Sequence, residues 1–291
     1  MKIVKILGGL GNQMFQYAFA YSIRDHGNDN NVLLDLHGFN GYNKHNGYEL
    51  GRLFQPKMKL ASLRELSRLA YPYFNYNIWR IGSRILPTRK SMIVEDTEKP
   101  IDTKLLTVDA PLYYDGYWQS EDYFKDIRAK ILEEFQFPAF TGKNAECARL
   151  ILGHNTLSIH VRRGDFLNKP LYTGIGTLDY YKNAIRKMND FADIDHVIVF
   201  SNDIKWCQLN LCDNLPPTTE YIDWNTGLES YNDMHLMSLC KYNIIANSSF
   251  SWWGAWLNNN PNKIVVCPQR WDNSHSVQNP ICNDWIRINS L

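Results

Sequence analysis

The chain has 291 residues and an apolar fraction of 44%, which suits globular folding, and at about 150 residues per domain its length predicts two domains. Its 31 lysines and arginines nearly balance 30 acids, so the composition argues against nucleic acid as a partner, and any anion site must be local. No run approaches the roughly 20 apolar residues of a membrane span, and the six cysteines lack metal-site spacing, so we expect reduced, mostly buried thiols.

The N-terminal segment has the pattern of a βαβ unit. An apolar run at 2–7 leads into Gly-Gly-Leu-Gly-Asn-Gln at 8–13, and apolar residues then recur at intervals of three and four before a second β-rich run at 32–36. The start of such a helix is a natural site for an anion or a polar ligand. The glycine spacing is not the dinucleotide fingerprint, so by itself it is a weak indication of ligand contact.

The middle of the chain, from about 38 to 114, has broken periodicity and many Tyr, Asn and Arg residues. We expect helices and loops around a cleft there. Beyond it, Ser120 is expected to cap a helix whose apolar stripe runs from Tyr123 to Phe135 and ends before Pro138. We interpret this stripe as core.

After Pro138 the pattern becomes regular. Strands at 156–161, 196–200, 243–246 and 263–267 alternate with helices near 178–190, 203–210, 228–240 and 250–258. This alternation predicts an α/β fold with a parallel, doubly wound sheet. We place the domain boundary between about 138 and 155, and divide the chain into domains 1–150 and 151–291.

A cluster of fixed charge, His-Val-Arg-Arg-Gly-Asp at 160–165, follows the first of these strands. Ligands of open α/β sheets bind in the crevice at the carboxyl ends of the strands. Arg162 suits a phosphate or pyrophosphate because its guanidinium is a bidentate fork, His160 adds a directional donor, and Asp165 would fix the guanidinium. Because alternate residues of a strand share a face, His160 and Arg162 should point together while Arg163 points away. The alternatives are a surface salt bridge at a turn and an Arg-Gly-Asp adhesion tripeptide.

Two further strand ends offer polar groups to the same crevice. Asn202 and Asp203 follow the strand at 196–200, where an acid can accept hydrogen bonds from guanine or can simply cap the next helix. The strand at 243–246 ends in a turn formed by Asn247, Ser248, Ser249 and Phe250. This turn suits a phosphate, and plain helix capping is the alternative. Together these groups predict a nucleotide diphosphate site. We find no Walker lysine loop and no Asp-x-Asp pair flanked by apolar residues, so we expect chemistry that requires no metal.

Four sequence blocks stand in a fixed order along nearly the whole chain: GGLGNQMFQYA at 8–18, HVRRGD at 160–165, FSNDIKWC at 200–207 and ANSSFSWWGAW at 246–256. Together they resemble the bacterial α-1,2-fucosyltransferases of glycosyltransferase family 11. The resemblance implies a GT-B architecture, in which two Rossmann-like, doubly wound domains face a central cleft. It also implies GDP-β-L-fucose as donor and inverting transfer to the 2-hydroxyl of a terminal galactose on a β-galactoside acceptor glycan, with the N-terminal domain on the acceptor side.

The same resemblance implies roles for individual residues. Arg162 matches the arginine that holds the donor pyrophosphate, with His160 beside it. Asp203 and the turn at 247–250 match donor-contacting positions, and Asn12 and Gln13 match a loop that faces the donor across the cleft. The family often carries two acids where this chain has Asn202 and Asp203, which leaves open which of the two reads the guanine.

The predicted reaction is a single displacement with Arg162, His160 and Asp165 as the catalytic group. Three candidates stay open for the base that takes the acceptor proton: Asp165, Gln13 acting through water, and an acid in the middle region. The alternatives are a transferase of another linkage or another GDP-sugar such as GDP-mannose, and a non-catalytic glycan-binding protein, for which the aromatic fraction of 13% argues.

The cellular location follows from what the chain lacks. The apolar stretch at the N-terminus is too short for a signal sequence and two lysines interrupt it, so we expect a cytoplasmic protein. Peripheral association with the inner face of the membrane stays open, and we find no basic amphipathic helix that argues for it.

Overall fold

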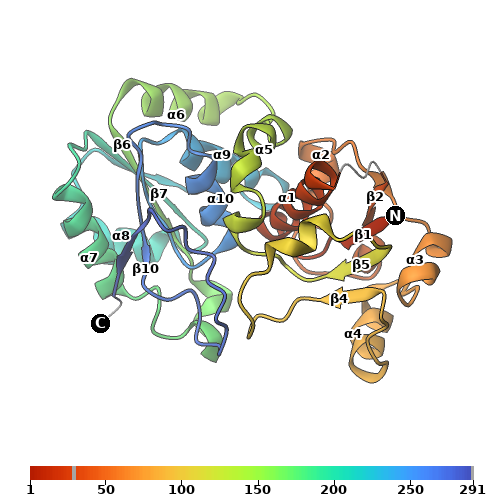
Figure 1. Ribbon diagram of the computed structural model, residues 1–291. Helices are drawn as coiled ribbons and strands as arrows, with labels where there is room; N and C mark the ends of the chain where they lie inside the picture. The colour runs from red at the N-terminus through yellow and green to blue at the C-terminus, as the bar shows by residue number, and fades with distance from the viewer. Residues whose placement is uncertain (28–30, 290–291) are drawn as a thin grey trace. The chain divides into compact units, whose positions relative to one another are not determined.

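The computed structural model describes residues 1–27 and 31–289, which form two compact units (Figure 1). Unit 1 comprises residues 1–137 and 276–280, and unit 2 comprises residues 138–275 and 281–291. Helix α6 (Gly142–Gly153) belongs to unit 2, whereas the sequence-based division at residue 150 assigns most of it to the first domain. None of the described helices has the length and apolar content that a bilayer crossing requires.

Unit 1 is built on a five-stranded parallel sheet in the order β3-β2-β1-β5-β4. The strands are β1 (Lys2–Lys5), β2 (Val32–Asp35), β3 (Lys59–Leu60), β4 (Met92–Val94) and β5 (Leu112–Asp115). Helix α1 (Leu10–His26) leads from β1 to β2. The βαβ unit predicted at the N-terminus is therefore confirmed.

The middle of the chain supplies short helices and loops, as expected from its broken periodicity. They are the 3-10 turns η1 (His37–Phe39) and η2 (Thr103–Thr107) and the helices α2 (Leu50–Leu53), α3 (Leu63–Leu69) and α4 (Tyr76–Ile85). A capping box formed by Ser62 and Glu65 starts α3. Every residue of α4 is at least partly exposed, and Figure 1 shows this helix beyond β4 at the margin of unit 1.

The prediction of one continuous helix after Ser120 is wrong. The segment forms two 3-10 turns and one short helix, namely η3 (Glu121–Tyr123), η4 (Lys125–Ile127) and α5 (Arg128–Glu134). Ser120 caps η3 by accepting from the amide of Asp122 at 3.1 Å. Phe124 leaves the helical region with φ −150°, and its ring packs against Phe15 at 6.1 Å between centroids. The stripe is nevertheless core, as interpreted, because its five apolar members are buried: Tyr123, Phe124, Ile127, Ile131 and Phe135.

Unit 2 is built on a six-stranded parallel sheet in the order β11-β10-β9-β6-β7-β8. The strands are β6 (Thr156–Val161), β7 (His196–Ser201), β8 (Thr219–Ile222), β9 (Tyr242–Ile244), β10 (Ile264–Pro268) and β11 (Ile286–Ile288). Numbered from β6 in chain order, the strands lie 3-2-1-4-5-6, which is the Rossmann order. The four predicted strands are confirmed as β6, β7, β9 and β10, whereas the edge strands β8 and β11 were not predicted because they are half-exposed and lack a continuous apolar run.

Helices cover both faces of this sheet, so the predicted doubly wound fold is confirmed. Helices α7 (Leu178–Asn189) and α8 (Ile204–Leu211) pack on one face, and α9 (Tyr231–Leu239) and α10 (Ser249–Leu257) pack together with α6 on the other (Figure 1). A Cβ added at Gly254 of α10 would lie 2.9 Å from the Cβ of Met237, so the close contact between α9 and α10 requires glycine there. The three tryptophans of α10 are buried, as predicted for helix core.

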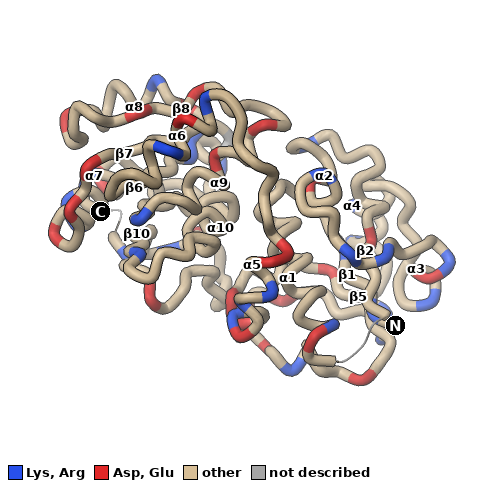
Figure 2. The backbone as a smooth tube through the Cα atoms, turned by 90° about the horizontal axis from the view of Figure 1, so that it is seen from above, with Lys and Arg blue, Asp and Glu red and all other residues tan. Residues whose placement is uncertain are grey.

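The charges and thiols agree with the expectations from composition. Figure 2 shows Lys and Arg interspersed with Asp and Glu in both units. All six cysteines are free thiols, and five are buried while Cys212 is exposed.

Candidate active site

The switch point of the unit 2 sheet lies between β6 and β9, where the chain connections leave toward opposite faces. His160 is the penultimate residue of β6, and Arg162 follows directly after the strand. Asn247 and Ser248 lie in the turn after β9. The ring of Phe250, in the first turn of α10, lies 5.8 Å from the His160 ring between centroids. The fold therefore brings together groups that are about 90 positions apart in the sequence.

His160 is buried, and its Nδ1 has no hydrogen-bond partner among the described residues. Burial, reinforced by the charge of Arg162, lowers the pKa of His160 to about 3. The imidazole is therefore neutral near pH 7 and can offer a directed hydrogen bond. A buried polar atom without a hydrogen-bond partner costs free energy, so this nitrogen is suited to a hydrogen bond with a ligand.

The two adjacent arginines have different surroundings. The Nε of Arg163 donates to Oδ2 of Asp203 at 3.2 Å, and its guanidinium carbon lies 4.0 Å from the Trp206 ring centroid. The guanidinium carbon of Arg162 lies 5.3 Å from the Phe166 ring centroid. Arg163 is thus held in the loop by Asp203 and Trp206. Ligand binding by Arg162 stays a prediction.

Asn202 and Asp203 connect the loops that follow β6 and β7. Asp203 caps α8 through Oδ1, which accepts from the Trp206 amide at 3.2 Å, and Asn202 Oδ1 accepts from the Arg163 amide at 2.9 Å. Gly164 has φ +52°, and a Cβ there would lie 2.5 Å from Nδ2 of Asn202, so only glycine suits this close approach. The helix-capping alternative is therefore present at Asp203, and guanine recognition by either side chain stays a prediction.

The turn after β9 is held by its own side chains. The Oγ of Ser248 accepts from the amide of Phe250 at 3.4 Å and caps α10, and the buried Asn247 donates from Nδ2 to the carbonyl of Trp271 at 2.9 Å. Ser249 is the first residue of the helix. The positive end of the α10 dipole therefore lies at the switch point, where phosphate binding by this turn stays a prediction.

Two tyrosines of α7 that the sequence analysis missed hold the strand ends at the switch point. The hydroxyl of Tyr180 donates to the carbonyl of Ile245 at 2.6 Å, and that of Tyr181 donates to the carbonyl of His160 at 3.2 Å. Burial raises the pKa of both hydroxyls. Their sequence signal, two aromatic residues on the buried face of a predicted helix, is the same as that of ordinary core.

Asn12 and Gln13 lie in the first turn of α1 in unit 1. Asn12 is partly exposed and its Oδ1 accepts from Nε2 of Gln119 at 2.8 Å. Gln13 is fully buried. All of its hydrogen-bonding positions are used. Its Nε2 donates to the carbonyls of Gly8 (2.8 Å) and Gly47 (2.7 Å). Its Oε1 accepts from the backbone amides of Glu49 (2.9 Å) and Leu50 (3.3 Å). In this arrangement the amide fastens the loop at 47–50 to the glycine turn. The ligand-facing role of Gln13 stays a prediction.

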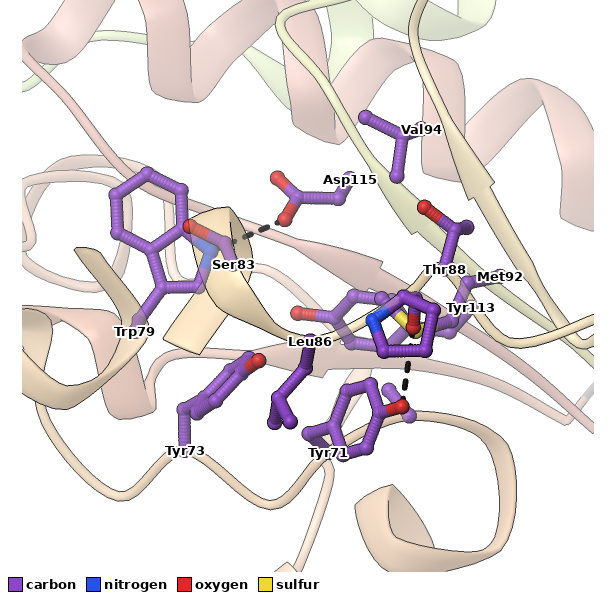
Figure 3. Close-up of a pocket in the computed structure, with 12 residues that line it drawn as sticks. Tyr71, Tyr73, Trp79, Ser83, Leu86, Thr88, Met92, Val94, Tyr113 and Asp115 are labelled. Atoms are coloured by element: carbon purple, nitrogen blue, oxygen red, sulfur yellow. Dashed lines mark hydrogen bonds between the residues drawn. The ribbon is translucent and has the colours of Figure 1, made fainter. Parts of the chain in front are cut away.

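Unit 1 also contains a pocket of about 250 Å³ beneath α4 (Figure 3). Its lining is rich in aromatic rings, with hydroxyls and one carboxylate between them: Ala70, Tyr71, Tyr73, Trp79, Ser83, Leu86, Pro87, Thr88, Met92, Val94, Tyr113 and Asp115. The Asp115 carboxylate accepts from Nζ of Lys5 at 3.0 Å and from Nε1 of Trp79 at 3.1 Å. Burial lowers the pKa of Lys5, and Asp115 opposes that shift. Aromatic walls with a few oriented polar groups suit a small polar ligand such as a sugar.

Three candidates were predicted for the base that takes the acceptor proton. Gln13 has no hydrogen-bonding position left for a bridging water. The side chain of Asp165 lies outside the part of the chain that the structure describes, so its catalytic role stays a prediction. In the middle region, Asp115 is an acid with a place in a pocket.

A sequence model of glycosyl transferase family 11 matches residues 92–289, a span that includes every strand of unit 2 and all of the switch-point residues. The chain belongs to glycosyltransferase family 11. An α-1,2-colitosyltransferase of Escherichia coli is 32% identical to this family 11 chain over 293 residues, which cover 98% of each protein. Galactoside α-(1,2)-fucosyltransferase 2 of Oryctolagus cuniculus is 21% identical over 269 residues, which cover 88% of this chain and 67% of that protein.

The family 11 chain also resembles a solved structure. The crystal structure of NodZ α-1,6-fucosyltransferase soaked with GDP-fucose matches it with a TM-score of 0.51 at 16% identity, over 88% of this chain and 91% of that one. At this identity the likeness speaks for the fold alone. The predicted GT-B fold class, with two Rossmann-like α/β units, is confirmed.

Proposed function

We propose that this family 11 glycosyltransferase moves L-fucose from GDP-β-L-fucose to the 2-hydroxyl of a terminal galactose, with inversion at the sugar carbon. The observation that carries the proposal is the set of groups at the switch point, where a buried neutral His160, Arg162 and the start of α10 meet at the ends of β6 and β9. These groups match a pyrophosphate in charge and in hydrogen bonding. The names of the relatives, which specify colitosyl and fucosyl transfer, support a deoxysugar donor.

In the proposed reaction the acceptor oxygen forms a bond to C1 of fucose while the bond from C1 to the β-phosphate oxygen breaks. GDP leaves with the electron pair, and the acceptor proton passes to a base or to water. Negative charge grows on the β-phosphate, where the fork of Arg162 stabilises it. His160 adds a hydrogen bond from a neutral ring, and the α10 dipole adds favourable potential. These groups supply the positive charge that a metal provides elsewhere, so the proposed reaction requires none.

We further propose that the pocket in unit 1 takes the acceptor sugar, with the Trp79 ring against the sugar and the Asp115 carboxylate accepting from its hydroxyls. Trp79→Ala should raise the KM for a β-galactoside at least about tenfold, since the stacking ring and one of the two donors that orient the Asp115 carboxylate are lost. The KM for GDP-fucose should stay unchanged. Ile78→Ala is the matched control, because Ile78 is on the same helix but does not line the pocket. Equal effects of the two variants on the acceptor KM would refute this use of the pocket.

Colitose is the second candidate donor sugar, because of the 32% identity to a colitosyltransferase. Colitose is fucose without its 3-hydroxyl. A site that hydrogen-bonds this hydroxyl rejects the sugar that lacks it by about 10⁴–10⁵, whereas a site shaped for the smaller sugar rejects the extra hydroxyl by only about 10². The ratio of kcat/KM values therefore identifies the sugar for which the site is built.

The deciding experiment compares GDP-fucose, GDP-colitose and GDP-mannose on a panel of β-galactosides, with the product linkage solved by NMR. We expect GDP-fucose to have the highest kcat/KM and the product to be an α-1,2-fucoside. A preference for GDP-colitose or another linkage would overturn the donor or linkage assignment. Calorimetry tests the alternative of a non-catalytic glycan-binding protein, because such a protein would bind the glycan with no affinity for GDP.

A further inference from the structure

Helix α4 exposes a stripe of isoleucines on the surface of unit 1. Ile78, Ile81 and Ile85 recur at intervals of three and four, so they share one side of the helix. Their exposed fractions are 38%, 56% and 72%. The adjoining Phe74 is also exposed. The opposite side of α4, which carries Trp79, lines the pocket of unit 1, so the stripe is directed away from the sheet.

Basic residues flank this stripe, and acids are absent from the sequence around it. Arg80 and Arg84 occupy a third side of α4 and are exposed, and Lys90 follows the helix. The stretch from 66 to 94 contains five Lys or Arg residues and no Asp or Glu, although the whole chain is nearly balanced at 31 to 30. The positive charge is therefore concentrated beside the apolar stripe.

We propose that α4 is a membrane-surface helix that docks this protein on a bilayer containing anionic phospholipids. The isoleucines would enter the boundary between headgroups and acyl chains, and the arginines would lie among the lipid phosphates. The absence of acids selects an anionic partner, and an apolar stripe beside cations matches the layered chemistry of a lipid surface. The proposal is independent of the donor and acceptor assignments.

The structure of α4, with an apolar stripe and two arginines beside it, differs from the sequence analysis, which found no basic amphipathic helix. The stripe has only three members, and Pro72, Gly82 and Pro87 lie in or beside the segment. Proline and glycine lower the expectation of a helix. Only the exposure of the isoleucines in the structure distinguishes the stripe from core.

The test is sedimentation of the full-length protein with vesicles, in the absence of any substrate. The protein should bind vesicles of mixed phosphatidylcholine and phosphatidylglycerol and bind pure phosphatidylcholine weakly. Raising the salt from about 0.1 M to 1 M should weaken binding, because the Debye length falls from about 10 Å to about 3 Å.

Two pairs of substitutions separate the apolar and the basic contributions. Arg80→Gln with Arg84→Gln should lower the partition coefficient about 25-fold, or about fivefold for each cation. Ile81→Ser with Ile85→Ser should lower it at least about tenfold. None of these four side chains lines the pocket, so turnover of soluble substrates should be unchanged.

The matched controls lie in unit 2. Leu152→Ser with Leu209→Ser removes two leucines that are 70% and 81% exposed, and Arg149→Gln with Lys205→Gln removes two exposed cations. Neither pair should alter vesicle binding. The proposal is overturned if the α4 variants bind as the controls do, or if the wild-type protein binds neither vesicle. It is also overturned if light scattering shows a dimer in lipid-free solution that only Ile81→Ser with Ile85→Ser dissociates, since α4 would then bind a second copy.

Discussion

Arg163 and Asp203 form an ion pair, Nε to Oδ2 at 3.2 Å, between the loops that follow β6 and β7. The pair joins neighbouring strand ends beside the switch point. It engages Arg163 in the structure of these loops and distinguishes it from Arg162, which the sequence places directly next to it. The two arginines should therefore respond to substitution in different ways.

Arg162→Ala should lower kcat by about 10²–10³, because the charge that develops on the departing phosphate loses its main partner. Arg162→Lys should also be poorly active, since a point charge lacks the bidentate fork. Steady-state rates with the preferred GDP-sugar measure this effect, and an unchanged unfolding midpoint serves as control. Turnover close to that of the wild type would remove Arg162 from the mechanism.

Arg163→Ala should lower the free energy of unfolding by about 1 kcal/mol, through loss of the partly exposed ion pair and of the contact with Trp206. Its effect on kcat should be smaller than that of Arg162→Ala. Urea denaturation measures the loss, and a double-mutant cycle with Asp203→Asn isolates the pair because asparagine can still cap α8. A stable Arg163→Ala protein with activity as low as that of Arg162→Ala would reverse the two assignments.

Gln13→Ala should destabilise the protein by about 2–4 kcal/mol, because four backbone groups around one buried amide lose their partner. Asn12→Ala is the control and should cost about 1 kcal/mol, since one partly exposed hydrogen bond is lost. Both free energies come from chemical denaturation. A stable Gln13→Ala variant with an increased KM for the GDP-sugar would instead support the predicted ligand-facing role.

The buried His160 should make the protein less stable in acid. Its pKa of about 3 in the folded state lies below the ordinary 6.5, so between these values the unfolded chain binds more protons. Its contribution to stability is therefore complete above about pH 6.5 and decreases as the pH falls, by about 2 kcal/mol at pH 5. His160→Asn should reduce the difference in unfolding free energy between pH 7 and pH 5 by about this amount. An unchanged difference would show that His160 titrates normally.

Activity should survive excess EDTA and should not increase when Mg²⁺ or Mn²⁺ is added, because Arg162 and the α10 dipole are proposed to carry the charge of the pyrophosphate. The measurement is the initial rate after dialysis against the chelator. Loss of activity that Mn²⁺ restores would mean that a metal takes part.

The second half of the chain was largely predictable from its sequence. Buried parallel strands such as Thr156–Val161 and His196–Ser201 are continuous β-favouring runs, and polar residues directly after them stand out against that background. The edge strands β3, β4, β8 and β11 were not predictable, because short strands with exposed residues carry no comparable pattern. The segment after Ser120 has helical spacing, but tertiary packing of Phe124 interrupts the helix.

The candidate site was likewise predictable from the sequence only in part. Local sequence pattern was sufficient to place His160, Arg162 and the turn at 247–250 at the carboxyl ends of strands, since strand periodicity and turn chemistry act between near neighbours. The pairing of Arg163 with Asp203, the enclosure of Gln13 and the pocket around Asp115 arise from contacts between residues 34 to 110 positions apart. Such contacts depend on the order of the strands and on the packing of side chains between elements, neither of which a local pattern encodes, so only the tertiary structure decides them.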